Sequence, residues 1–416
     1  MITLLGFKLM ITILIGFITF SVISSEDINE QPALFKIVLK EPVGLERIDE
    51  YIDCVLQIEM EPSGMKDFSI IAEDTNTGKL IPCQIYEKKF FAKENKMICS
   101  IIFPVSMEAN EEKTIFLRST CDKMSIPTDL NIKGNGSELM IDNQFYKADL
   151  TRSNQSEGKN HLSGQLRELL IKMDYNKLLF RSQNRMHWAP NFQRNGSEHY
   201  KTIADWDNPK INNIYEGPYV IITERQDRAP EHPEILLSAC YKFYAQKPYF
   251  RFYSCMEMKQ DIWLYLLRND EMTMDTLFTH VAFQDQSNNI IDLSFSSRKK
   301  YLKDNPIGNE NPWLCFYNQQ KGYAFGSIRI KYNNDNQFGN TSPTFMPHTK
   351  ISDGSGGGKY WNRRLIHECN TFVPKGSRYK EENAYLVFEI SPEDKFYQIK
   401  YWAKRLRNPI LVTFKN

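Results

Sequence analysis

One segment gathers side chains that could work on a sugar. NRMHWAPNFQRNGSEHY, residues 184–200, places His187 beside Trp188 and adds Arg194 and Tyr200 within a stretch that also holds Pro and Gly. Imidazole transfers protons near neutral pH, indole stacks on sugar rings, and loops often carry such groups. We expect His187 and Tyr200 to be catalytic, with Trp188 and Arg194 binding substrate. The alternative is a surface loop that anchors Trp188 in a sheet.

Two further positions could complete such a site. Arg268 and Asn269 stand at the end of a strand-like run and could neutralise a carboxylate, although an ion pair at a turn would explain Arg268 equally well. His280 alternates with apolar residues in LFTHVAF. It is therefore either a third catalytic group on a concave floor or an interior histidine with satisfied hydrogen bonds.

A glycine-rich turn, residues 353–358, leads into Tyr360, Trp361 and Arg363. We expect an aromatic platform here, with a guanidinium able to clamp a carboxylate. Because side chains alternate along a strand, only one of Arg363 and Arg364 can face a given cleft. GSGGGK lacks the GxxxxGK[ST] spacing of a phosphate-binding loop. The alternative is a solvated loop with a packing tryptophan.

These side-chain types fit eliminative cleavage of a uronate polymer. That reaction removes a proton alpha to a carboxylate, so it needs a group that neutralises the carboxylate, a base, and a proton donor for the leaving oxygen. Arg, Asn or a metal ion serves the first need, and His or Tyr serves the others. Asp205 and Asp207 are candidate ligands for a divalent cation such as Ca²⁺, and no other cofactor is expected. Hydrolysis by two carboxylates stays open, because it leaves no fixed sequence spacing.

The elements that must position these groups are strands. Across residues 32–125, short apolar runs alternate with turn residues, which predicts a small β-barrel or sandwich. Residues 130–390 hold more and longer alternating runs than one flat sheet accommodates, which predicts a large antiparallel β-supersandwich. Within it, residues 164–180 read either as a helix or as two strands. Residues 391–416 carry an apolar helical stripe, so we expect an all-β protein with a C-terminal helix and tail.

Composition bounds the partners and the compartment. The 416 residues include 52 Lys+Arg against 51 Asp+Glu, so no basic surface for nucleic acid is expected. Residues 1–25 place Lys8 before an apolar run that is short for a membrane span, which predicts a signal peptide cleaved near Ser24 or Ser25 rather than an anchor. We expect a secreted or periplasmic bacterial protein without membrane contact after cleavage. Its eight cysteines are expected to be mainly buried free thiols.

Strand and turn patterns also carry a family resemblance. IPCQIY and ICSIIFPVSMEANEEKTIFLRS, followed by GPYVIITERQDR, PYFRFYSCMEM and VPKGSRYKEENAYLVFEI, resemble the exo-rhamnogalacturonan lyase-like (YetA-like) secreted proteins. The likeness covers about residues 32–390 and implies a small β-barrel followed by a supersandwich. The larger relatives add a helical barrel domain that this chain is too short to hold; if cleavage needs that domain, the expectation is a protein that only binds sugar. No motif of the family is specific enough to transfer catalytic residues.

Together these observations predict a secreted, polysaccharide lyase-like protein that cleaves an acidic, uronate-containing polysaccharide or oligosaccharide by β-elimination. A non-catalytic glycan-binding protein is one alternative. A glycoside hydrolase or sugar epimerase with the same fold is another. The hypothesis requires that loops and strand ends distant in sequence meet over one trough in the larger domain.

Overall fold

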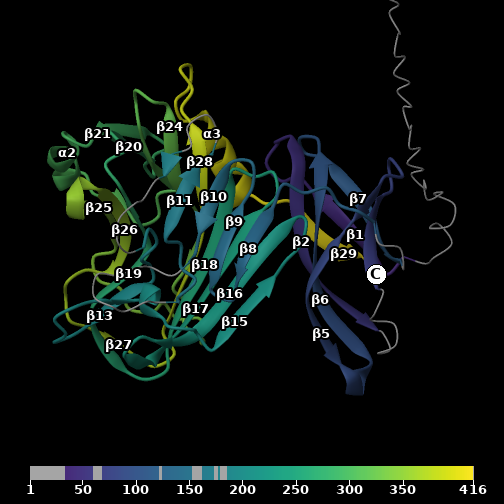
Figure 1. Ribbon diagram of the computed structural model, residues 1–416, viewed down its shortest axis with the longest axis horizontal. Helices are drawn as coiled ribbons and strands as arrows, with labels where there is room; N and C mark the ends of the chain where they lie inside the picture. Colours follow the sequence, from purple (N-terminus) through teal and green to yellow (C-terminus); the bar gives the residue numbers. More distant parts are fainter. Residues whose placement is uncertain are drawn as a thin grey trace, which may run out of the picture.

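The computed structural model describes residues 33–59, 68–120, 124–151, 162–172, 177–178 and 185–415. The predicted signal peptide, residues 1–25, lies outside these ranges. Antiparallel strands dominate the described chain, and its longer α-helix lies near the C-terminus (Figure 1). The predicted all-β class is therefore confirmed. No helix in the described ranges is long and apolar enough to cross a membrane.

A small sandwich is built from two sheets. One sheet has the spatial order β29 (Leu411–Lys415), β1 (Phe35–Lys40), β7 (Glu112–Thr120), β3 (Ser69–Asp74) and β4 (Leu80–Pro82). The other has the order β2 (Arg47–Glu59), β6 (Lys96–Met107) and β5 (Gln84–Phe91). Alternate side chains of both sheets, such as Ile37, Leu56 and Ile101, meet in one apolar core.

The large domain is organised around a nine-stranded antiparallel sheet. Its spatial order is β15 (Ile211–Tyr215), β16 (Val220–Ala229), β17 (His232–Tyr244), β18 (Tyr249–Met258), β28 (Arg378–Glu389), β24 (Tyr323–Asn333), β23 (Trp313–Tyr317), β20 (His280–Gln284) and β21 (Ile290–Ser294). Long alternating runs form these strands because each sheet face packs on a different layer. Tyr241, for example, belongs to one buried cluster and Val220 to another.

Two smaller sheets cover one face of the nine-stranded sheet. The seven-stranded sheet has the order β14 (Lys201–Thr202), β13 (Asn191–Arg194), β19 (Ile262–Met274), β26 (Lys359–Ile366), β25 (His348–Asp353) and β22 (Ile307–Gly308), with β27 (Thr371–Val373) beside β19. The five-stranded sheet has the order β12 (Lys177–Leu178), β11 (Glu168–Ile171), β10 (Tyr146–Asp149), β9 (Glu138–Asp142) and β8 (Asn131–Asn135). The described part of residues 164–180 is thus strand rather than helix.

Helix α3 (Tyr397–Arg407) packs on the other face of the nine-stranded sheet. Ile399, Ala403 and Leu406 are buried at helical spacing in the cluster on that face. The helix lies so close to β24 that a Cβ atom at Gly326 would come within 2.6 Å of Ile399 Cδ1. A glycine is therefore required there.

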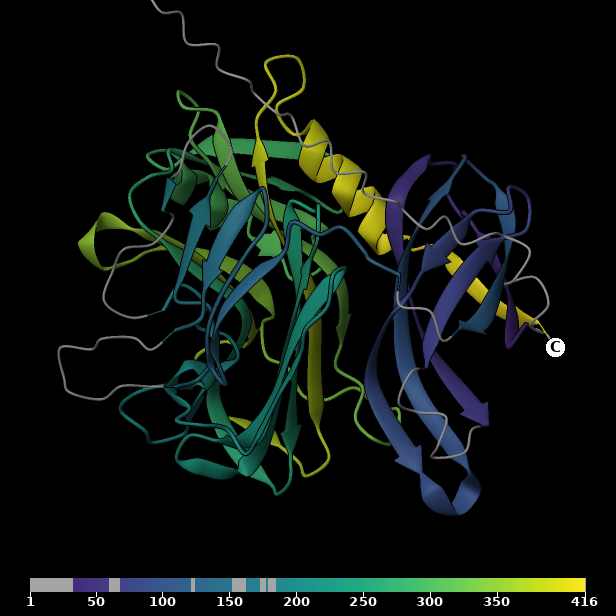
Figure 2. The ribbon, with the colours of Figure 1, turned by 45° about the vertical axis from the view of Figure 1, so that its right-hand side comes forward.

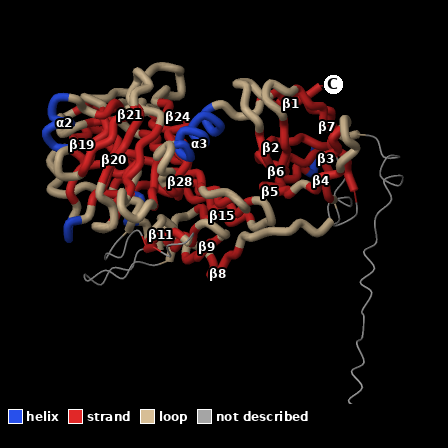
Figure 3. The backbone as a smooth tube through the Cα atoms, turned by 90° about the horizontal axis from the view of Figure 1, so that it is seen from above, coloured by secondary structure: helices blue, strands red, loops and turns tan. Residues whose placement is uncertain are grey.

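The C-terminal tail is a strand of the small sandwich. After α3 the chain crosses back and β29 pairs with β1, as Figure 2 shows, and Figure 3 shows α3 between the two bodies. This pairing joins segments at opposite ends of the sequence, which local patterns do not reveal. A shorter helix, α2 (Arg298–Asp304), lies near β25 in the large domain.

A buried arginine fastens the returning chain. The Arg47 guanidinium binds Glu41 at 2.6 Å and donates to the carbonyl oxygens of Arg405 at 3.3 Å and Asn408 at 2.8 Å. It thus satisfies carbonyl groups at the end of α3. Burial alone would raise the pKa of Glu41, but Arg47 and several backbone N–H groups lower it to about 2.

We predict that Arg47→Ala lowers the free energy of unfolding by about 3–5 kcal/mol, because it leaves the Glu41 carboxylate buried without its cation. Urea unfolding followed by tryptophan fluorescence measures the change. Lys210→Ala is the control, since Lys210 is largely exposed and its Asp227 contact is 3.8 Å long. That control should stay within about 0.5 kcal/mol of wild type. An Arg47→Ala variant equally close to wild type would contradict the buried ion pair's role.

Candidate functional site

A row of polar side chains crosses the outward face of the seven-stranded sheet. Asn191 of β13 pairs with Arg268 of β19, Arg268 pairs with Arg364 of β26, and Arg364 pairs with His348 of β25. Direct cross-strand partners share one face of an antiparallel sheet. Leu365, next to Arg364, lies in the core between the sheets. The polar row, Asn191–Arg268–Arg364–His348, therefore faces away from that core. Arg268 and His348 are partly exposed, whereas Asn191 and Arg364 are buried beneath neighbouring side chains.

Aromatic rings flank one end of the polar row. The Arg268 guanidinium lies 5.5 Å from the ring centroid of Tyr200, and the Trp188 ring lies 6.5 Å from the same tyrosine in an edge-on arrangement. Tyr200 is 40% exposed and Trp188 is half-buried. Tyr360, which pairs with Thr273 on the outward face, is also half-buried. Aromatic side chains with a few well-placed polar groups are common at ligand-binding sites.

Cations crowd this face. Arg268 and Arg364 are neighbours across β19 and β26, and Lys350 pairs with Asn362 in the adjacent position. Burial lowers the pKa of Arg364, and the Arg268 charge lowers it further. The pKa of Lys350 is also lowered, by burial and by the charges of Arg364 and Arg268. Arg268 Nε and Asn362 Nδ2 are buried without a hydrogen-bond partner. A bound anion would relieve the repulsion between these cations.

Two carboxylates accompany the arginines. Glu271 lies 3.6 Å from Arg268 and accepts a 2.8 Å hydrogen bond from Asn191 Nδ2, while Glu368 lies 2.7 Å from Arg364. Burial raises the pKa of Glu271 against the effect of Arg268. The hydrogen bond from Arg364 lowers the pKa of Glu368. The two groups therefore differ in how readily they hold a proton.

Hydrogen bonds assign different roles to two histidines beside Arg364. His348 Nδ1 lies 2.8 Å from the Met346 carbonyl oxygen, so Nδ1 carries the hydrogen and Nε2 keeps its lone pair. Burial and the Arg364 charge lower the pKa of His348, although the hydrogen bond to Met346 raises it. The lowered pKa favours a neutral imidazole. His367 Nδ1 instead accepts from Arg364 at 2.6 Å, so its Nε2 carries the hydrogen.

Tyr200 has the opposite protonation preference. Partial burial of this half-exposed side chain, and then the negative charge of Glu271, raise the pKa of the phenol to about 12 even though Arg268 lowers it. Tyr200 therefore holds its proton at neutral pH and can donate it. Of the two roles that the sequence allowed for tyrosine, the geometry supports the acid.

The residues predicted from the sequence divide between two faces. Trp188, Tyr200, Arg268 and Tyr360 meet on the outward face, as described above. His187, Asn269, Trp361 and Arg363 point into the space between the large sheets. Each predicted neighbouring pair is split, because successive side chains of a strand point to opposite sides.

The inward group belongs to a buried network. His187 is fully buried, with Nδ1 2.6 Å from the Tyr241 hydroxyl, and burial together with Arg225 lowers its pKa. Trp361 Nε1 donates to Asp270 at 3.0 Å. These groups are inaccessible to a polymer in this structure, and their predicted roles in substrate contact gain no support from it.

Arg363 and Asn269 share the inward face. The Arg363 guanidinium stacks 3.6 Å from the Tyr332 ring centroid, and its Nη1 lies 3.5 Å from Asn269 Oδ1. The clamp predicted from Arg363 or Arg364 is thus left to Arg364, which is itself only 2% exposed and whose Nε and Nη1 already bond Asn362, His367 and Glu368. The alternation of Trp361 and Leu365 around Arg363 was the sequence signal that could have decided this.

Two predicted residues lie elsewhere. His280 lies in the nine-stranded sheet, where its ring stacks on Tyr317 with 5.1 Å between the ring centroids. Its Nδ1 forms a hydrogen bond with the Thr279 hydroxyl. Arg194 reaches Glu234 of β17 at 3.2 Å. Neither contacts the polar row. The sequence analysis in turn missed His348 and Lys350, which become neighbours of Arg364 and Asn362 only through strand pairing.

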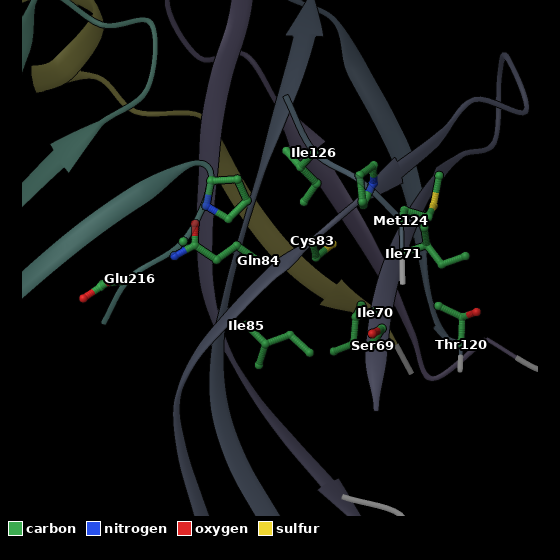
Figure 4. A pocket seen from close by; sticks show the side chains of 13 residues that line it. Ser69, Ile70, Ile71, Cys83, Gln84, Ile85, Thr120, Met124, Ile126 and Glu216 are labelled. Carbon is green, nitrogen blue, oxygen red and sulfur yellow. The ribbon is translucent and has the colours of Figure 1, made fainter. Parts of the chain in front are cut away.

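A separate hollow lies where the small sandwich meets the chain before β16. It has a volume of about 590 Å³ and is mainly lined by apolar side chains. Figure 4 shows Ile70, Ile85, Ile126 and Cys83 around it, with Glu216 set apart. Gln84 at its wall binds the Val220 backbone through both N–H and carbonyl groups. This hollow lies at the junction of the two domains, and its lining residues include no cluster of catalytic groups.

The described ranges contain no group of three or more His, Cys, Asp or Glu side chains arranged to hold a metal ion. Asp205, a candidate ligand, accepts a hydrogen bond from the Thr202 backbone as part of a helix cap. The seven cysteines within the described ranges are free. Cys121 lies outside those ranges.

Known structures share this fold. A protein of glycosyl hydrolase family 38 from Enterococcus faecalis has a TM-score of 0.51 and 10% identity, and covers 94% of this chain and 49% of its own. An alpha-mannosidase from Enterococcus faecalis V583 has a TM-score of 0.54, also at 10% identity, with coverages of 94% and 48%. This chain thus spans about half the length of each. At such identity the likeness shows the fold alone. No protein-family model matches the chain, and no curated protein matches it either.

We predict that Arg364→Gln raises the pKa of both His348 and His367, since it removes a neighbouring positive charge from each. Titration of the imidazole C–H signals by NMR measures both values. His280 is the internal control, because the charges that act on it are those of Asp292 and Lys395. An unchanged His367 pKa would contradict the hydrogen bond from Arg364.

Proposed function

We propose that this protein acts on an acidic, uronate-containing glycan at the outward face of the seven-stranded sheet, and cleaves it by β-elimination. The observation that carries the proposal is the polar row itself. Two neighbouring guanidinium groups lie between a neutral imidazole with a free Nε2 and a phenol that holds its proton. These are the three functions that elimination next to a carboxylate requires.

Each group has a definite role in this proposal. Arg268 and Arg364 bind the uronate carboxylate and stabilise the negative charge that develops when the alpha proton leaves. His348 Nε2 accepts that proton. The electron pair of the broken C–H bond forms the new double bond, the beta carbon–oxygen bond breaks, and Tyr200 donates its proton to the leaving oxygen.

Spacing supports the assignment. Arg268 and His348 are two strands apart, and adjacent strands lie about 4.8 Å apart, so the backbones at Arg268 and His348 are separated by roughly 10 Å, with Tyr200 beside Arg268. A sugar ring bound over the two arginines would lie between them. Trp188 and Tyr360 would contact neighbouring rings.

Hydrolysis of the same glycan is a second candidate, favoured by one observation. Glu271 and Glu368 each accompany one arginine of the row, and their pKa values shift in opposite directions. Paired carboxyl groups with separated pKa values are the usual arrangement for glycoside hydrolysis. The fold shared with glycoside hydrolase structures supports a carbohydrate substrate for either reaction. Export of the protein and kinship with rhamnogalacturonan lyase-like proteins remain part of the proposal.

We predict that Arg268→Gln and Arg364→Gln each lower kcat/KM by about 100-fold or more, because the charge of the intermediate loses its counter-ion. Tyr200→Phe and His348→Gln should lower kcat by about 10²–10⁴-fold. The assay incubates purified protein with polygalacturonate and with rhamnogalacturonan and follows the ultraviolet absorbance of the unsaturated product. Arg194→Gln, on an exposed arginine away from the row, is the matched control and should keep wild-type turnover.

The products discriminate the mechanisms. If the assay yields new reducing ends but no unsaturated product, and Glu271→Gln and Glu368→Gln abolish that activity, the reaction is hydrolysis and not elimination. Glycan binding without either product would leave a binding protein.

A further inference from the structure

A groove lies between helix α2 and the edge of β25. β25 pairs with β26 along its whole length, but on its other side it pairs with β22 only at His348 and Thr349. The rest of that edge borders a groove of about 580 Å³ whose other wall is α2. Figure 1 shows α2 and β25 close together in the part of the large domain far from the small sandwich.

The groove is strongly cationic. Four cationic side chains line it: Arg298, Lys299, Lys303 and Lys350. Asp353 is the single carboxylate among the lining residues. Asp353 is already engaged by Arg298 at 2.5 Å, by Lys299 at 2.8 Å and by Lys359 at 3.2 Å. Among the described residues, no carboxylate lies within ion-pair distance of Lys303 or Lys350. The groove therefore keeps a positive excess after Asp353 is counted, and Glu368, whose charge raises the pKa of Lys350, is the other carboxylate that acts on it.

The groove is continuous with the polar row. His348 belongs to both, and Lys350 lies one position further along β25, beside Asn362. Lys350 and Asn362 are one pair, and His348 and Arg364 the pair two residues away on the same face, so the two cationic regions adjoin, and the Arg364 and Arg268 charges lower the pKa of Lys350. A chain bound over the row would extend past His348 directly into the groove.

We propose that this groove is a subsite for a second acidic sugar of the same chain, so that the protein selects extended polyanionic glycans over isolated acidic sugars. The inference rests on the proposed function. A neutral sugar would leave Lys303 and Lys350 without a counter-ion, whereas a carboxylate or sulfate on the second sugar would pair with them. Lys303, on α2, would act only on this second sugar, because it lies outside the polar row.

Calorimetric binding of galacturonate monomer and of hexameric oligogalacturonate to the full chain tests the proposal. Lys303→Glu should weaken hexamer binding by about tenfold and reduce its salt dependence, while monomer binding changes less than twofold. Lys321→Glu, with the same charge change on an exposed lysine, is the matched control and should bind both ligands as wild type. Circular dichroism checks that the variants are folded.

The outcomes separate the two proposals. If Arg268→Gln weakens hexamer binding but Lys303→Glu does not, the groove is not a subsite and the proposed function stands. Equal losses for monomer and hexamer in Lys303→Glu would also overturn the subsite. If wild type binds neither ligand, both proposals fail together.

Discussion

The arrangement of the site depends on one buried carboxylate. Asp270 of β19 accepts hydrogen bonds from Trp361 at 3.0 Å and Tyr385 at 3.3 Å, and from Arg329 Nε at 3.1 Å. The donors come from β26, β28 and β24, so a single side chain joins the seven-stranded sheet to the nine-stranded one. Removing it would leave several buried donors without an acceptor, which is costly in a protein interior.

The position of Asp270 also sets which groups reach solvent. The pairing of β19 with β26 shifts between Asn269 and Met272, and Asp270 has a left-handed φ of 47° at this bulge. The bulge turns Asp270 inward, whereas Glu271 lies beside Arg268. Without the bulge, strict alternation along β19 would place Asp270 on the same face as Arg268 and Glu271 on the opposite face. The interior hydrogen bonds and the external polar row are thus two results of the same backbone irregularity.

Strand content and class followed from the sequence because alternation is a local property. Of the residues that the sequence singled out, Trp188, Tyr200, Arg268 and Tyr360 lie together on the outward face. Local patterns did not show which residues of each strand point outward and which point inward. Adjacent residues such as His187 and Trp188 were assigned to one cleft, although a strand sends neighbours to opposite faces.

Cross-strand neighbours were the other missing information. His348 gains its place beside Arg364 only through the register of β25 with β26, and nothing near His348 in the chain signals it. The pairing of β29 with β1 spans an even larger separation. Such register is fixed by packing of whole sheets, which depends on contacts far apart in sequence.

That last pairing constrains the order in which the molecule can be completed. β1 is synthesised before the other described strands, yet one of its edges is covered only by residues 411–415. Until those residues emerge, the earliest domain presents unpaired backbone groups, which invite association with other chains. The first domain in sequence is therefore the last whose sheet can close, and α3 delivers the strand that closes it.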